Sequence, residues 1–232
     1  MDYPIREFAA GGGILIAVVA ILHVVVSHFA VGGGLVMAAL EGSAVKRNDR
    51  PMRDLVKRSS QILLLLSTVF GAISGVGIWF TIGVVHPAAT SSLIHTFVWA
   101  WAIEWAFFLL EVVTALAWVA TWEKVSPKTH LLLIRLYAFA AFMSLVVIQG
   151  ILGFMLTPGR FPATASVADG FLNPTYLPGL LFRTGVCFAL GVWIAWRWSA
   201  GPSADNWSST FFIAQLLQAP LKWLMASKAS QR

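Results

Sequence analysis

Long apolar stretches alternate with short polar segments along the chain. Five stretches of 23 to 30 residues cover residues 11–40, 60–85, 93–122, 129–157 and 176–198. A helix needs about 20 mostly apolar residues to cross the hydrocarbon core of a bilayer. The segments between the stretches carry Pro, Gly or charged residues, which end helices. The pattern therefore predicts an all-α fold, a polytopic bundle of about five membrane-spanning helices.

A different pattern follows the fifth stretch. Residues 207–226 combine aromatic side chains with Ser, Gln and Lys, and Pro220 interrupts them. A helix with one apolar and one polar face lies in the membrane interface instead of crossing it. We therefore expect residues 1–200 to form the transmembrane bundle and residues 201–232 to form an interfacial amphipathic helix and tail.

Composition and charge support a membrane protein. Hydrophobic residues make up 58% of the 232 residues and charged residues only 11%, whereas soluble proteins average about 25% charged residues. The net charge is +6, but six of the 16 Lys and Arg lie between Lys46 and Arg58, beside the first expected span. Basic loops remain on the cytoplasmic side. We therefore expect the N-terminus outside and the C-terminus inside, and no nucleic-acid partner.

Ionisable side chains inside the apolar stretches are the strongest functional signal. A charged group at the bilayer centre costs about 2.5 to 3.5 kcal/mol on insertion scales, so such residues usually mark a functional path. The chain has one cysteine and no Cys-x-x-Cys-His, so a cofactor would be held without a covalent bond, by His or a carboxylate. The ionisable candidates are His23, His28, Glu104, Glu111 and Arg183.

Two of these candidates lie on the first expected span. A neutral imidazole at His23, near mid-membrane, can coordinate haem iron through one nitrogen. His28 lies five positions on, about 140° around the helix, so both residues cannot bind one iron from the same face. The alternative for each histidine is a polar residue hydrogen-bonded to a neighbouring helix.

The other three candidates are two carboxylates and a guanidinium. Glu104 and Glu111 are seven positions apart, so they lie nearly on one helical face, about 10.5 Å apart along the axis. Such a pair suits a proton relay, or one member can bind iron. Arg183 can bind a haem propionate or pair with a glutamate. The alternatives are a structural Glu–Arg183 pair or a Glu capped by Thr114, and an Arg183 that extends to the interface.

Weaker signals lie near the ends of the expected spans. His86 and His95 are expected near the outer surface, as surface or capping histidines, or as ligands of a second haem. His130 is interpreted as a boundary residue at the start of the fourth span. The triplets 11–13 and 32–34 are all glycine, which allows close approach of a neighbouring helix or a flat macrocycle.

The ordered residues of these spans resemble subunit I of the cytochrome bd quinol oxidases over roughly residues 10 to 200. His23 takes the place of that family's haem-ligating histidine on the first helix, with Glu41 at the matching helix end. No single short motif is diagnostic, but the set is ordered as in the family. The residues that carry the resemblance are Leu22-His23-Val24, Ile103-Glu104, Phe107-Phe108-Leu109, Glu111, Trp122-Glu123-Lys124, Gly150-Ile151-Leu152-Gly153-Phe154-Met155 and Leu172-Asn173-Pro174.

This resemblance implies a haem b-binding membrane subunit of a respiratory electron-transfer complex in a bacterial or archaeal cell membrane. One or more b-type haems are expected, and a d-type haem is an alternative. His23 is the implied axial ligand, Glu104 and Glu111 the second ligand or proton relay, and Arg183 the propionate clamp. Electrons would pass between a quinol or an extracytoplasmic c-type cytochrome and a high-spin haem, with oxygen as a candidate acceptor, and other membrane subunits are the expected partners.

Two departures from the family limit that expectation. The family's fifth helix carries a histidine for the low-spin haem, whereas this sequence has Phe182-Arg183-Thr184 there. The chain also corresponds to the N-terminal half of a subunit I, without the quinol-binding loop. The alternative function is a membrane anchor or assembly subunit without redox chemistry, and a third reading is a small transporter.

Overall fold

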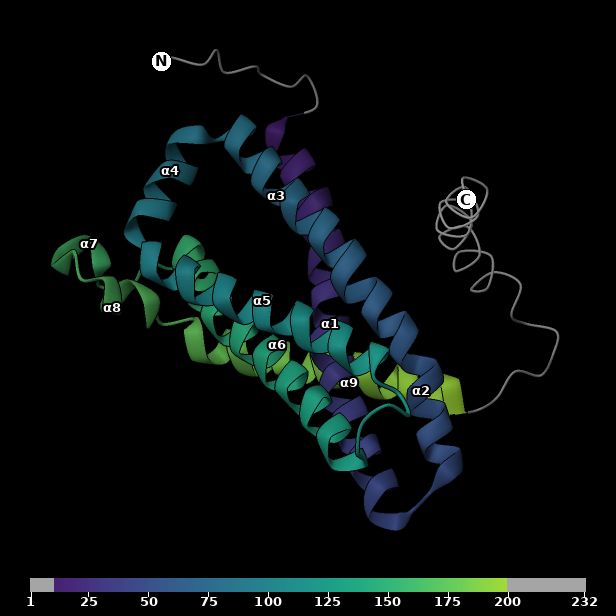
Figure 1. Cartoon of the computed structure of the whole chain (residues 1–232). Coiled ribbons are helices and arrows are strands. Elements are labelled where there is room, and N and C mark those ends of the chain that lie inside the picture. The colour runs from purple at the N-terminus through teal and green to yellow at the C-terminus, as the bar shows by residue number, and fades with distance from the viewer. Residues whose placement is uncertain (1–10, 200–232) are drawn as a thin grey trace. The chain divides into compact units, whose positions relative to one another are not determined.

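A computed structural model of the chain describes residues 11–199. Every regular element in that range is helical (Figure 1). Residues up to Ala195 belong to one compact unit. The expected interfacial helix at 207–226 lies outside the described residues, so the division at residue 200 remains a prediction. The elements are α1 (Gly12–Arg47), α2 (Arg50–Leu64), a π-helix η1 (Leu65–Phe70), α3 (Gly71–Val85), α4 (Pro87–Thr96), α5 (Val98–Ala120), α6 (Pro127–Leu156), α7 (Phe161–Thr164), α8 (Val167–Phe171) and α9 (Tyr176–Ser199).

Five helical segments are long and apolar enough to cross a membrane, as the sequence predicts. They are Gly12–Arg47, Arg50–Val85, Val98–Ala120, Pro127–Leu156 and Tyr176–Trp196. The second segment combines α2, η1 and α3 and begins ten residues before the apolar stretch. Its start is fixed by the side chain of Asp49, which accepts a hydrogen bond from the backbone N–H of Met52 at 3.0 Å.

The third expected span is divided in the structure. Residues 87–96 form the separate helix α4, and the backbone leaves helical geometry at Phe97, with φ −117° and ψ 32°. Pro87 stands at the first position of α4, where its missing N–H costs no hydrogen bond. His95 therefore ends α4 instead of opening the third span, and both His86 and His95 are exposed, as expected.

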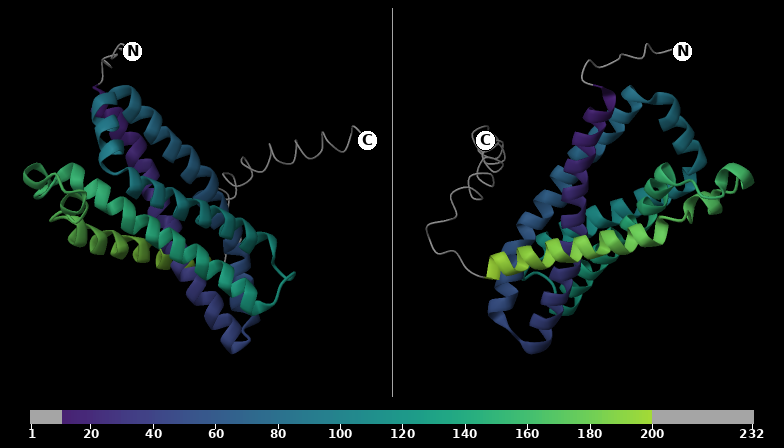
Figure 2. Two further views of the ribbon diagram at one scale, coloured as in Figure 1. Left: turned by 60° about the vertical axis from the view of Figure 1, so that its left-hand side comes forward. Right: turned by 180° about the vertical axis from the view of Figure 1, so that it is seen from behind.

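The spans pack as neighbouring pairs. α1 contacts α2, η1 and α3 along one side and α6 along another, and α5 contacts α6 along most of its length. Figure 2 shows α1 beside the α2–α3 segment and α5 beside α6 in both views. Residues 48–49 join α1 to α2 within the basic segment 46–58, and the Thr121–Ser126 turn joins α5 to α6. The ion pair of Lys57 with Glu123 shows that these two connections lie at one end, which we call the basic end.

The close crossing of α1 and α9 depends on glycine. A Cβ atom at Gly32 would collide with the backbone carbonyl of Cys187, and one at Gly191 would collide with the backbone of Gly32. Around this crossing, the side chains of Val31 (α1), Ala141 and Leu145 (α6) and Cys187 (α9) form a buried apolar cluster. The second glycine triplet therefore serves helix packing, the plainer of the two expectations.

The connection between α6 and α9 is held by Asn173. Its side-chain amide donates hydrogen bonds to the carbonyls of Gly150 and Gly170, and its side-chain oxygen accepts one from the backbone N–H of Thr175. Asn173 is only 3% exposed, so this side chain satisfies backbone groups that water cannot reach. The short helices α7 and α8 are thereby fixed at the end opposite the basic end.

Candidate functional site

His23 faces the second span rather than lipid. Its Nδ1 atom lies 3.0 Å from Oγ of Ser74 on α3, and the side chain is half-buried. Gly75 allows this approach, because a Cβ atom there would lie 3.3 Å from Cε1 of the imidazole. The histidine is therefore held by the neighbouring second span, through Ser74 and the backbone of Gly71.

The hydrogen bonds of Ser74 assign the tautomer of His23. The Ser74 hydroxyl has one hydrogen, which it donates to the carbonyls of Phe70, at 2.5 Å, and Gly71, at 3.2 Å. Its lone pairs then accept the hydrogen on Nδ1 of His23. A neutral imidazole protonated on Nδ1 carries its free lone pair on Nε2. Within residues 11–199 no side chain forms a hydrogen bond with Nε2, so this atom is available to a metal.

His28 is oriented within its own helix. Its Nδ1 atom lies 2.6 Å from the backbone carbonyl of Val24, and since a carbonyl only accepts, Nδ1 carries the hydrogen. The side chain is buried at 6% exposure. Arg183 on α9 lies close enough for its charge to act on the imidazole. The structure thus brings together two of the expected residues, from α1 and α9.

The two glutamates line the contact between α5 and α6. Oγ of Ser144 on α6 donates a hydrogen bond of 2.9 Å to Oε1 of Glu104. Seven residues further along α5, the Glu111 carboxyl lies beside the Tyr137 hydroxyl of α6. The Tyr137 hydroxyl also donates to the carbonyl of Ala30 on α1, at 3.2 Å. The carboxyls are therefore placed next to hydroxyl groups rather than next to cations.

These contacts repeat at heptad spacing. Glu104, Glu111 and Trp118 follow one another at intervals of seven on α5, and Ser144, Tyr137 and His130 do so on α6. Because α5 and α6 run in opposite directions, each member of the first set faces one of the second. The three facing pairs are Glu104 with Ser144, Glu111 with Tyr137, and Trp118 with His130, and we call this series the α5–α6 ladder. Its last pair, Trp118 with His130, lies at the basic end.

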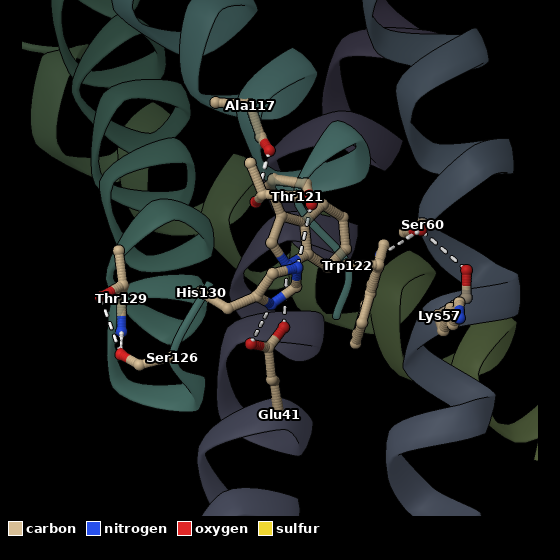
Figure 3. A network of polar contacts seen from close by, with 10 residues as sticks. Glu41, Lys57, Ser60, Ala117, Thr121, Trp122, Ser126, Thr129 and His130 are labelled. Atoms are coloured by element: carbon tan, nitrogen blue, oxygen red, sulfur yellow. Dashed lines mark hydrogen bonds and ion pairs between the residues drawn. The ribbon is translucent and has the colours of Figure 1, made fainter. Parts of the chain in front are cut away.

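At the last pair of the ladder lie the most buried acidic and basic side chains in the described part of the chain, Glu41 and His130. Glu41 on α1 is 1% exposed and His130 on α6 is 2% exposed. Nδ1 of His130 lies 2.6 Å from Oε1 of Glu41, and the indole N–H of Trp118 donates to Oε2 of Glu41 at 2.8 Å. Figure 3 shows the imidazole between Glu41 and Trp122, whose ring centroid lies 4.0 Å from that of His130.

The partners of His130 determine its hydrogens. Nε2 lies 2.9 Å from the backbone carbonyl of Trp118, so Nε2 carries a hydrogen and donates it. A single proton then lies between Nδ1 and Glu41, and the pair is either imidazolium and carboxylate or two neutral groups. Both forms have no net charge, which is how the bundle buries two ionisable groups at low cost.

The expected residues do not all meet at one point. Within residues 11–199 no hydrogen bond or ion pair joins His23 to Glu104 or Glu111, and Arg183 forms neither. The expected structural alternatives for the glutamates are not seen there, because Thr114 bonds the backbone carbonyls of Leu110 and Glu111 instead of a carboxylate. Over the same residues, no three His, Cys, Asp or Glu side chains gather as a site for a bare metal ion.

Three polar contacts of the site were not predicted from the sequence. Ser74, Ser144 and the pairing of His130 with Glu41 all join segments 40 to 89 positions apart. His130 does lie at the start of the fourth span, as expected, but the sequence did not reveal that it is buried and paired with Glu41. The signal available in the sequence was the seven-residue spacing from His130 through Tyr137 to Ser144, opposite a matching series on the preceding span.

Comparison with known proteins agrees with this arrangement of spans and polar residues. The family model for cytochrome bd terminal oxidase subunit I matches residues 14–194, which include nearly all of the five spans. A search of curated proteins finds no match to the chain. The family model covers more than half of the sequence, and subunits of this family bind haem and work with other subunits of a membrane complex. The chain therefore belongs to the cytochrome bd terminal oxidase subunit I family and is a multi-pass, haem-binding membrane subunit of an oxidase.

Proposed function

We propose that this subunit binds a b-type haem with His23 as the axial ligand. The observation that carries the proposal is the hydrogen bond from Nδ1 of His23 to Ser74, which leaves the Nε2 lone pair free. Metal-ligating histidines almost always donate their other ring N–H to a fixed partner, which sets the tautomer and the ring orientation. Bound haem would supply one-electron chemistry at its iron.

Arg183 and His28 suit the propionate side of a haem. Arg183 is half-buried and forms no ion pair within residues 11–199, so its guanidinium is available to an anion. A propionate accepts the paired N–H groups of a guanidinium. His28 lies beside Arg183, and its place about 140° around α1 from His23 separates it from the ligand position.

We assign Glu104 and Glu111 to proton transfer rather than to iron ligation. Each carboxyl adjoins a hydroxyl group, that of Ser144 or Tyr137, and these groups can both accept and donate a proton. Both carboxyls lie inside a membrane span, where a charged side chain is costly, so each can take up and release a proton. Oxygen reduction to water consumes protons, which such a pair can deliver.

The subunit would act between an electron donor and oxygen. A quinol or a reduced c-type cytochrome would supply the electrons, a bound high-spin haem would receive them, and oxygen is the candidate acceptor. The cluster of basic residues in Lys46–Arg58 supports a cytoplasmic basic end, with the N-terminus outside and the C-terminus inside. Large apolar side chains remain exposed on several spans and suit contact with lipid or with the other membrane subunits, among them Phe80, Trp99, Trp105, Phe182 and Trp193.

The test is the reduced-minus-oxidised spectrum of the purified complex, with pyridine-haem quantitation and carbon monoxide addition. The wild type should show a b-type signal, and His23→Ala should lose at least one haem per complex. His95→Ala is the matched control, because His95 is exposed and, among the described residues, its imidazole bonds to Ser91 on its own helix alone. Carbon monoxide binding would place oxygen chemistry in the complex. A complete complex without haem would contradict the proposal and favour the anchor function.

A further inference from the structure

A hollow at the basic end is separate from the residues proposed to bind haem. It lies where the first turns of α2 pass the connection between α5 and α6, and its volume is about 300 Å³. We call it the basic pocket. It is lined by Arg50, Arg53, Asp54, Lys57, Trp122 and Glu123.

Three cationic side chains of the basic pocket come from one face of α2. Arg50, Arg53 and Lys57 are spaced at i, i+3 and i+7, which places them one above another along the helix. Arg50 is exposed, Arg53 is half-buried, and Lys57 is half-buried as a whole residue but has an exposed side chain. The guanidinium carbon of Arg53 lies 5.8 Å from the centre of the Trp122 ring, so the ring positions this cation.

Trp122, the aromatic residue that lines the basic pocket, is held in place by contacts outside the pocket. The indole N–H of Trp122 donates to Oγ of Ser60 at 3.2 Å, and Ser60 is completely buried. The opposite contact of the indole is with the ring of His130, which Glu41 holds in place. Figure 3 shows Trp122 between His130 and the helix that carries Ser60 and Lys57. The pocket wall is therefore formed before any ligand binds.

The charges of the pocket favour an anion. Three cations face two carboxylates, and only Lys57 is paired, with Glu123 at 2.5 Å. That ion pair is exposed, at 43% for Lys57 and 73% for Glu123, and exposed pairs contribute little to stability. Within residues 11–199, Arg50 and Arg53 form no ion pair. A phosphate can therefore bind the guanidinium groups of Arg50 and Arg53, which form no ion pair in this part of the chain, and replace Glu123 at Lys57.

We propose that the basic pocket binds the phosphate headgroup of an anionic phospholipid. The pocket opens where a membrane span begins, since α2 continues through η1 and α3 as one segment to Val85. Tryptophan is typical of the headgroup level of the bilayer. Further along the segment the exposed side chains are apolar, as at Val69 and Ile73, and lipid chains can lie against them. A soluble phosphate would bind only the charged pocket, whereas a phospholipid would also contact the apolar surface next to it, so we assign the lipid. The site does not depend on the haem assignment.

The experiment measures lipid binding to the purified complex by native mass spectrometry. The probes are phosphatidylglycerol, phosphatidylcholine, which has no net charge, and soluble glycerol 3-phosphate. Arg50→Gln/Arg53→Gln should weaken phosphatidylglycerol binding about tenfold or more, and Arg50→Lys/Arg53→Lys should keep most of it. Lys46→Gln/Arg58→Gln removes the same charge outside the pocket and should change binding less than about twofold.

A variant expected to gain binding excludes misfolding as the explanation. Glu123→Gln removes the carboxylate that competes for Lys57, so phosphatidylglycerol should bind more tightly by a few-fold. The proposal requires both this gain and the selective loss in the arginine variant. Equal losses in the two double Gln variants would show attraction by surface charge alone and overturn it. Equal affinity for glycerol 3-phosphate would assign the pocket to a soluble phosphate, which also overturns it.

Discussion

Nδ1 of His130 lies 2.6 Å from Oε1 of Glu41, although the two residues are 89 positions apart in the chain. This contact joins the end of α1 to the beginning of α6, and Trp118 adds α5 through its indole N–H and its backbone carbonyl. Three spans therefore meet at one buried polar cluster at the basic end. The cluster closes the α5–α6 ladder, which leads through Tyr137 and Glu111 to Glu104.

Loss of one member of this pair should destabilise the bundle strongly. In His130→Leu the Glu41 carboxyl remains buried and retains only Trp118 as a side-chain partner, which is expected to cost about 3 to 5 kcal/mol. Glu41→Leu/His130→Leu should recover much of that loss, because no unpaired ionisable group remains. Unfolding in detergent micelles measures both. The exposed pair Lys57–Glu123 is the control, and its removal should have little effect. Equal effects for the buried and exposed pairs would contradict the structure.

The crossing of α1 and α9 should not tolerate even one methyl group. Gly32→Ala places a Cβ against the backbone carbonyl of Cys187, and backbone atoms cannot turn aside as a flexible side chain can. We expect a loss of about 1 to 3 kcal/mol in unfolding measurements. Gly13→Ala on the same helix is the control, because a Cβ there meets open space. It should be neutral or slightly stabilising, since alanine favours helix more than glycine does.

Glu104→Gln separates proton transfer from iron ligation. Glutamine can still accept the hydrogen bond from Ser144 but cannot carry a proton, so we expect unchanged haem content and a fall of about a hundredfold in oxygen consumption by the complex. Ser144→Ala should reduce turnover less, because the carboxyl remains. Loss of haem in Glu104→Gln would instead make Glu104 a ligand. Both quantities are measured on one preparation by pyridine-haem quantitation and an oxygen electrode.

The loop that follows α6 should loosen in acid. The guanidinium of Arg160 donates a hydrogen bond of 2.7 Å to Asp169, and this contact holds the pKa of Asp169 below its usual value, with a smaller effect from Thr164. A lowered pKa in the folded state means that the contact stabilises the loop above the ordinary carboxyl pKa and that this is lost as the pH falls through the lowered value. Amide exchange in residues 161–171, corrected for intrinsic rates, should therefore be constant from neutral pH to about pH 5 and rise below about pH 4. Asp169→Asn should remove the pH dependence.

Hydropathy was sufficient for the number and order of the spans but not for their limits. α2 begins at Arg50, before the apolar stretch, because its start depends on the Asp49 cap and a polar first turn, which a hydropathy pattern does not detect. α4 separates from α5 at Phe97 through a change in backbone angles within apolar sequence. Both differences result from local backbone chemistry, whereas the spans result from the bilayer itself.

The candidate residues were predictable, but their partners were not. His23, Glu104 and Glu111 could be selected because ionisable groups in apolar sequence are costly. Ser74 and Ser144 could not be selected in this way. A serine in a span can donate its hydroxyl hydrogen to a backbone carbonyl of the preceding turn, as Ser74 does to Phe70, so its presence in apolar sequence carries little cost. Which serine meets which candidate depends on how two helices are rotated and shifted against each other, and that is decided by packing.

Ligation through Nε2 of His23 is the central claim, and chemical rescue tests it most directly. His23→Gly removes the imidazole and leaves Ser74 without its partner, so the purified complex should lose the corresponding b-type band in the reduced-minus-oxidised spectrum. Added imidazole should restore that band in His23→Gly, because the free ligand can occupy the space of the lost side chain. His28→Gly should keep the band without imidazole. A His23→Gly complex with the full wild-type spectrum, or rescue seen only in His28→Gly, would contradict the account.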